Sequence, residues 1–139
     1  MRLRACDTED DAAFVVSVRN DPETRKHSRR QHLLTYADLI DAPNGGIRET
    51  RIAEVDGVNV GYLHFDRLGD ACELSWNIDP VHRRKGYGTQ MVQASIALAD
   101  RPSVVAEIKP DNVASVRIAE HCGFRFAEAH DGLLVYRKS

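Results

Sequence analysis

Apolar and polar residues alternate along much of the chain in short runs that are typical of β-strands. A strand with one buried face shows this two-residue period. Turn residues such as Asp56-Gly57 and Asp131-Gly132 separate neighbouring runs, as they do in tight hairpins. The pattern predicts seven strands, at residues 2–5, 49–55, 58–65, 71–78, 104–108, 124–129 and 133–137.

Other segments repeat their apolar residues at the three- and four-residue spacing of helices. Four helices are predicted: from a cap at Asp7 or Thr8 to Asn20, at residues 35–40, from the glycine turn at 86–88 to Ala99, and from 112 to about 121. The resulting order is β-α-α-β-β-β-α-β-α-β-β. This order predicts one α/β domain over residues 1–139, with a mixed sheet and a parallel helical crossover.

Composition narrows the class of protein. A net charge of −2 over 139 residues gives no general electrostatic reason for binding nucleic acid or membranes. No apolar run reaches the length of a membrane span or a signal sequence. The three cysteines lack metal-ligand spacing, so we expect no metal and a reducing, cytoplasmic compartment.

Residues 74–99 read as a strand, a basic glycine turn and a helix. The first N–H groups of a helix have no partner within it, and they favour an anion. Gly86 and Gly88 let the backbone approach a ligand, and Arg83, Arg84 and Lys85 add positive charge. The stretch therefore predicts a site for a pyrophosphate.

Two familiar glycine motifs do not match this turn. The dinucleotide-binding fingerprint needs a third glycine where Met91 stands. The phosphate loop of nucleotide triphosphatases needs Gly-Lys followed by Ser or Thr, whereas here Lys85 precedes Gly86. A different pyrophosphate ligand is indicated.

The stretch resembles the GNAT superfamily of acetyl-CoA-dependent N-acyltransferases, whose motif is (Gln/Arg)-x-x-Gly-x-(Gly/Ala). Arg83, Gly86 and Gly88 fill its fixed positions. A second signature of that family, an asparagine with a small residue three positions on and a helix that ends in Gly-Phe, is similar to Asn112 through Phe124. The resemblance implies the GNAT fold and acetyl-CoA as cosubstrate.

In that family two parallel strands splay apart and admit the pantetheine arm of CoA, which pairs with the backbone of one strand. The resemblance also implies that backbone N–H groups of the glycine turn bind the pyrophosphate. The cofactor residues expected on this basis are Trp76, Asn77, Ile78, Arg83, Arg84, Lys85, Gly86, Tyr87, Gly88, Thr89, Asn112 and Ser115.

The resemblance names Glu73 as the first candidate for the general base, because many members carry a glutamate on that strand. Glu107, His64 and a water relay are alternatives. Many members also place a tyrosine acid seven residues after the asparagine, but this chain has Ala119 there. A tyrosine acid therefore cannot be carried over to this position, and Ser115 is the second catalytic candidate.

The polar, basic segment at 19–32 is either a solvated connection or the border of the acceptor site. It resembles the same region in GNAT subgroups that act on nucleotide-linked amino sugars or protein N-termini. On the second interpretation Arg25, His27, Ser28 and Arg30 hold an acceptor's phosphate or carboxylate.

A nucleotide-linked amino sugar is the first expectation for the acceptor, ahead of a protein N-terminus or another small amine. A succinyl donor in place of acetyl, or a CoA-binding module without catalysis, are the alternatives. The chain is expected to be a monomer, or a homodimer joined by the edge strands of its last hairpin.

Overall fold

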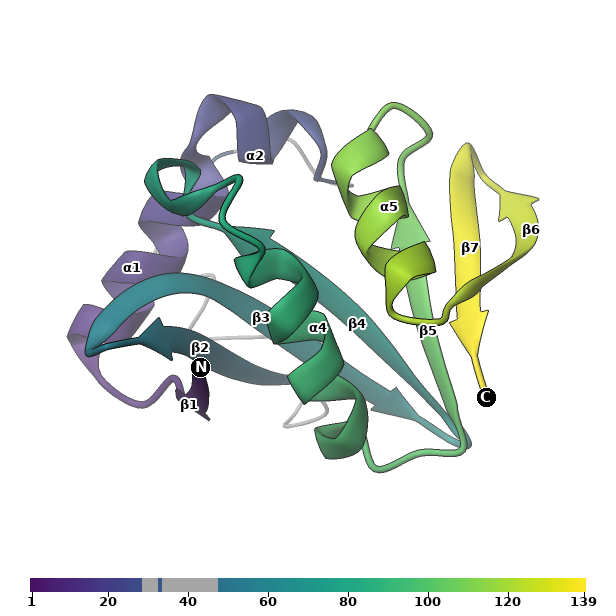
Figure 1. Cartoon of the computed structure of the whole chain (residues 1–139), viewed down its shortest axis with the longest axis horizontal. Coiled ribbons are helices and arrows are strands. Elements are labelled where there is room, and N and C mark those ends of the chain that lie inside the picture. Colours follow the sequence, from purple (N-terminus) through teal and green to yellow (C-terminus); the bar gives the residue numbers. More distant parts are fainter. Residues whose placement is uncertain (29–32, 34–47) are drawn as a thin grey trace.

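A seven-stranded mixed sheet with helices on both faces forms the protein (Figure 1). The computed structural model describes residues 1–28, 33 and 48–139. The strands are β1 (Arg2–Ala5), β2 (Arg48–Val55), β3 (Val58–Leu68), β4 (Ala71–Ile78), β5 (Ser103–Ile108), β6 (Arg125–His130) and β7 (Leu133–Lys138), in the order β1-β2-β3-β4-β5-β7-β6. The helices are α1 (Glu9–Asn20), α2 (Pro22–Lys26), α4 (Tyr87–Leu98) and α5 (Val113–His121), with a 3₁₀ turn, η1, at Pro80–His82.

The alternating pattern predicted the strands correctly, with bounds that differ by at most a few residues. The cap of α1 is Thr8, whose side chain accepts a hydrogen bond from the backbone N–H of Asp11 at 3.1 Å. The helix predicted at 35–40 lies outside the described residues. The polar segment holds a helix that the pattern did not predict, α2, which Asp21 caps and Pro22 begins.

Two apolar clusters lie on opposite faces of the sheet. The larger one packs α4 and α5 against β3, β4 and β5, and includes Phe65, Leu74 and Met91. The smaller one packs α1 against β2 and β3 through Val18 and Tyr62. Among the described helices, none is long and apolar enough to cross a membrane.

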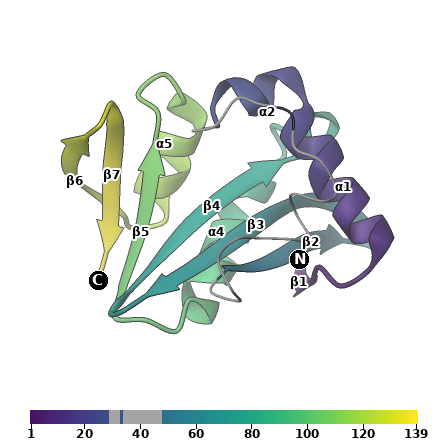
Figure 2. The same ribbon diagram turned by 180° about the vertical axis from the view of Figure 1, so that it is seen from behind.

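The parallel strands β4 and β5 are hydrogen-bonded at one end only. Their register runs from Ala71↔Ser103 to Glu73↔Val105, and there the pairing ends. β5 continues alongside β7, while β4 continues alongside β3. The two strands diverge into a V that both face views of the sheet show (Figures 1 and 2).

The first turn of α4 lies against α5 without an intervening side chain at Gly88. A Cβ added to Gly88 would lie 2.6 Å from Ile118 Cδ1 and 3.8 Å from Ile78 Cγ1. The absence of a side chain there therefore sets how closely the two helices approach beside the V.

We expect Gly88→Ala to destabilise the protein by about 1–3 kcal/mol through overpacking against Ile118. Ile118→Val alone should also destabilise, since it removes a packed methyl group. In the Gly88→Ala background the same change should be neutral or stabilising, because it removes the clashing Cδ1. Urea unfolding of the four proteins tests this cycle, and additive effects would contradict it.

Candidate active site

The basic turn between β4 and α4 contains two residues with left-handed backbone. Arg84 has φ 64° and Gly86 has φ 78°. Asp79 fixes the path of the chain from β4 into this turn. Its N–H donates to Val60 O at 2.8 Å, and its carboxylate accepts from Val81 N at 3.4 Å. Arg84 and Lys85 are exposed. The turn thus presents two solvent-facing cations immediately before a helix.

The N-terminus of α4 has no side-chain cap. Gly86 occupies the cap position, and a glycine cannot offer a side-chain oxygen to the free N–H groups of the first turn. The other α-helices that the structure describes are each capped, by Thr8, Asp21 and Asn112. An anion such as a pyrophosphate can take the place of the missing cap.

Beyond Glu73, one edge of β4 turns its backbone groups into the V. Alternate residues of an antiparallel pair face opposite neighbours. Asp79 N–H points at β3, so Leu74, Trp76 and Ile78 turn their N–H and C=O groups toward β5. The carbonyl of Ile78 accepts from Arg83 Nε at 3.3 Å. An extended ligand can therefore pair with this edge as an added strand would.

Trp76 carries a buried donor without an acceptor. Its ring lies edge-to-face against Phe124, with 6.5 Å between the ring centroids. Among the described residues, no hydrogen-bond partner reaches its indole Nε1. Leaving a buried N–H unpaired costs about 1–3 kcal/mol. The donor is enclosed by protein, whereas the open β4 edge and the uncapped α4 together fit the amides and pyrophosphate of a CoA molecule.

The start of α5 borders the V, but no hydroxyl stands at residue 119. Asn112 caps the helix by accepting from Ser115 N at 3.2 Å, and Ser115 is half-buried. Ala119 is fully buried in the main core. Burial raises the pKa of Tyr62 to about 12 and also raises that of Tyr136. Neither phenol therefore gains acidity from its surroundings.

The opposite face of β4 carries Glu73, Ser75 and Asn77, on the side that packs against α1. Asn77 Nδ2 donates to Tyr62 Oη at 2.9 Å, which holds the amide in place. Glu73 is half-buried at the vertex of the V, opposite Asp66 on β3. Trp76 lies three positions after Glu73, about 10 Å along the strand. A base at Glu73 therefore needs a water to reach the middle of the V.

Arg48 and His64 complete the polar face beside Glu73. Arg48 donates to both carboxylate oxygens of Asp66 at 2.9 Å. His64 Nδ1 lies 2.8 Å from Thr50 Oγ1. Burial, with a smaller effect of Arg48, lowers the pKa of His64 to about 3. His64 therefore stays neutral and has little affinity for an acceptor's proton.

Of the expected acceptor residues, Arg25 lies on α2, and His27 and Ser28 directly follow this helix, at the open end of the V (Figure 2). His27 Nδ1 is 3.5 Å from Asp111 Oδ1 on the loop after β5, and Ser28 Oγ donates to Thr24 O at 3.0 Å. Arg25 is half-buried, and its charge adds to the burial that lowers the pKa of Arg19. Arg30 lies outside the described residues.

Sequence reasoning missed two hydrogen bonds that join α2 to the rest of the molecule. Arg83 Nη2 donates to Thr24 Oγ1 at 2.8 Å, and Lys109 Nζ donates to Lys26 O at 3.2 Å. These pairs are 59 and 83 residues apart in the chain, and no local pattern signals either of them. Among the described residues, no three His, Cys, Asp or Glu side chains converge as a metal site would require.

We expect the protein to lose stability as the pH falls from about 6.5 towards 3, partly through His64. The unfolded chain protonates this histidine near its ordinary pKa of 6.5, whereas the folded chain holds the pKa at about 3. The unfolded state therefore binds more protons in this window, and one such group contributes at most about 1.4 kcal/mol per pH unit. Urea unfolding at several pH values should show a shallower slope for His64→Gln than for the wild type. Identical slopes would contradict the assignment.

Comparisons with known proteins agree with this geometry. The sequence profile of the acetyltransferase (GNAT) domain family matches residues 1–125. A mycothiol acetyltransferase from Saccharomonospora viridis is 38% identical over 69 residues, which cover 46% of this chain and 21% of that relative. The chain thus spans about a fifth of the length of this curated relative.

Two solved structures share the fold. Spermidine N-acetyltransferase from Vibrio cholerae, in complex with CoA and spermine, has a TM-score of 0.80 at 15% identity, covering 98% of this chain and 92% of that chain. A protein of Salmonella typhimurium, solved with its cofactor acetyl-CoA, has a TM-score of 0.75 at 20% identity, covering 100% and 93% of the two chains. At these identities the likeness supports the fold alone.

Proposed function

The chain belongs to the acetyltransferase (GNAT) family, and from that premise we propose that it transfers an acetyl group from acetyl-CoA directly to a primary amine. One observation carries the proposal. The uncapped N-terminus of α4 lies where β4 ends, at the mouth of a V whose β4 edge is open. These two features supply donors for a pyrophosphate and a partner for an extended amide chain.

Different residues at the V bind different parts of the cofactor. The free N–H groups at the start of α4 bind the pyrophosphate, and Arg84 and Lys85 add attraction from the exposed turn. Backbone groups of β4 beyond Glu73 pair with the pantetheine amides. Bound acetyl-CoA supplies the activated acyl thioester.

The acceptor approaches from the α1 face, where the carboxylate of Glu73 lies. An amine must lose its ammonium proton before it can attack, and Glu73 takes this proton through a water. The N–H group of Ile78 points into the V, where it polarises the thioester carbonyl. With Ala119 in place of a tyrosine, we assign protonation of the leaving thiolate to solvent.

The acceptor is a primary amine on a molecule that also bears an anionic group. Arg25 on α2 lies close enough to Arg19 for the two positive charges to repel each other. His27 follows at the C-terminal end of the same helix. An anion near Arg25 relieves this repulsion. A nucleotide-linked amino sugar is the first acceptor to test, followed by protein N-termini and other small amines.

The cytoplasmic compartment and the oligomeric state both stay predictions. Cys6, Cys72 and Cys122 are all free thiols, which favours the reducing cytoplasm. Every residue of the edge strand β6 is exposed, and Phe126 is 56% exposed beside Tyr136. A homodimer through this edge stays a prediction.

Purified protein with acetyl-CoA should release free thiol in the presence of one acceptor class from a panel of nucleotide-linked amino sugars, peptides with free N-termini and polyamines. Glu73→Gln should lower kcat by about 100-fold and leave CoA affinity unchanged, since only the proton transfer is lost.

Glu107→Gln is the comparison variant, because Glu107 on β5 is the alternative base. A larger loss of kcat in Glu107→Gln than in Glu73→Gln would move the base to β5. Tight CoA binding without thiol release from any amine would instead identify a module that binds CoA without catalysis.

We expect Gly86→Asp to weaken CoA binding about tenfold or more, because it places a carboxylate beside the pyrophosphate. Gly57→Asp is a matched control. Gly57 has φ 79° against 78° for Gly86, and an added Cβ meets nothing within 4 Å at either position. Both variants thus carry the same backbone strain, but Gly57 lies in the hairpin between β2 and β3. Calorimetric titration with CoA measures the difference, and equal affinities in the two variants would refute the cofactor placement.

A further inference from the structure

The helix α2 is too short to be stable by itself. It has five residues, and forming one helical turn fixes several backbone angles for few hydrogen bonds. Asp21 caps it by accepting from the N–H groups of Glu23 and Thr24 at 3.0 and 3.2 Å. Its order therefore depends on contacts with the rest of the protein, and those contacts lie on both sides of the V.

Arg83 makes the contact on the β4 side. Its Nη2 donates to Thr24 Oγ1 at 2.8 Å, and its Nε donates to Ile78 O at 3.3 Å. Thr24 is 2% exposed, so its hydroxyl is enclosed by protein. One guanidinium thus joins the basic turn, the end of β4 and α2.

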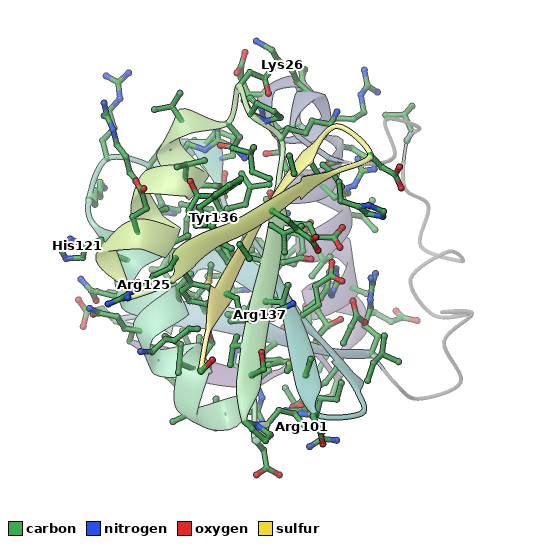
Figure 3. All side chains as sticks on the ribbon, turned by 90° about the vertical axis from the view of Figure 1, so that its right-hand side faces the viewer. Lys26, Arg101, His121, Arg125, Tyr136 and Arg137 are labelled. Carbon is green, nitrogen blue, oxygen red and sulfur yellow. The ribbon has the colours of Figure 1, made fainter. Side chains whose placement is uncertain are left out.

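Lys109 makes the contact on the β5 side. Its Nζ donates to Lys26 O at 3.2 Å, and Asp111 from the same loop approaches His27. Figure 3 shows Lys26 at the same end of the molecule as this loop and at the opposite end from Arg101. The helix is therefore tied to both sides of the V where the strands are farthest apart (Figure 2).

Two of the three guanidinium nitrogens of Arg83 are bonded within the protein, whereas Arg84 and Lys85 project from the turn into solvent. Arg84 and Lys85 therefore remain available to attract phosphate. Arg83 instead transmits the position of the turn to the helix on the acceptor side.

We propose that Arg83 is a positioning residue that couples CoA binding at the turn to the order of α2, and so to the affinity for the amine. The inference rests on the proposed function, because it requires CoA at the α4 N-terminus. A ligand that orders the turn also orders Arg83. Ordering α2 through the bond to Thr24 then costs less conformational entropy. Two sites that share an element in this way bind cooperatively.

Hydrogen exchange of the α2 amides with and without CoA tests the coupling. In the wild type, CoA should slow exchange both at residues 84–89 and at residues 24–28, the latter by about fivefold. In Thr24→Val, CoA should still bind, with a Kd raised by at most about fivefold, and protect 84–89, but its effect on 24–28 should be lost. Thr24→Ser keeps the hydroxyl and should restore the protection.

Two further variants separate this role from a structural one. Glu23→Gln changes an exposed residue of the same helix and should behave as the wild type. Arg83 belongs to neither apolar cluster, so Arg83→Ala should retain the sheet and its core, and it should abolish the α2 response as Thr24→Val does. With the acceptor that the amine panel identifies, Thr24→Val should raise KM about fivefold and leave kcat unchanged.

The two failures have different signatures. CoA binding with wild-type protection of α2 in Thr24→Val and Arg83→Ala overturns the coupling and leaves the proposed function standing. Absence of CoA binding by the wild type overturns the proposed function, and the coupling with it.

Discussion

The end of hydrogen bonding between β4 and β5 is the constraint on which the rest of the structure depends. After Glu73↔Val105, each strand keeps its outer neighbour and loses its inner one. A gap in a sheet leaves backbone groups without partners, which is unfavourable unless water or a ligand pairs with them. The helices α4 and α5 pack against each other over one side of the gap. The site thus consists chiefly of main chain, and side chains adjust it.

The gap also separates two chemical environments. On the α4 and α5 side, Leu74 and Ile78 extend the main core, and Trp76 adds its single unpaired donor. On the α1 side, carboxylates and amides form a polar face in which Asp66 is neutralised by Arg48. An apolar wall suits the pantetheine arm and a polar face suits an amine. One opening through the sheet can therefore receive two different substrates from opposite sides.

Local patterns predicted most of the fold because its strands alternate regularly and Asp-Gly pairs mark the hairpins. The glycine turn was found in the same way, from Gly86, Gly88 and the basic residues before them. The helix α2 was missed although Asp21 and Pro22 form a local start signal, because it has only five residues and its contacts with Arg83 and Lys109 come from 59 and 83 positions away. The low pKa of His64 likewise reflects burial by the folded protein, which no spacing encodes. These features depend on contacts between residues far apart in the chain, and local sequence patterns do not predict such contacts.

The two glycines of the turn meet different physical demands. Around Gly86 there is room for a side chain, so its requirement is conformational: φ is 78°, a value that other residues adopt only at a cost of about 1–2 kcal/mol. Gly88 has ordinary helical geometry, and its requirement is space, because Ile118 occupies the position of its Cβ. Arg84 has φ 64° without a glycine, so the turn also contains one residue that bears this conformational cost with a side chain. A motif of fixed glycines can therefore combine one backbone constraint with one packing constraint, and a substitution has to be judged against the demand at its own position.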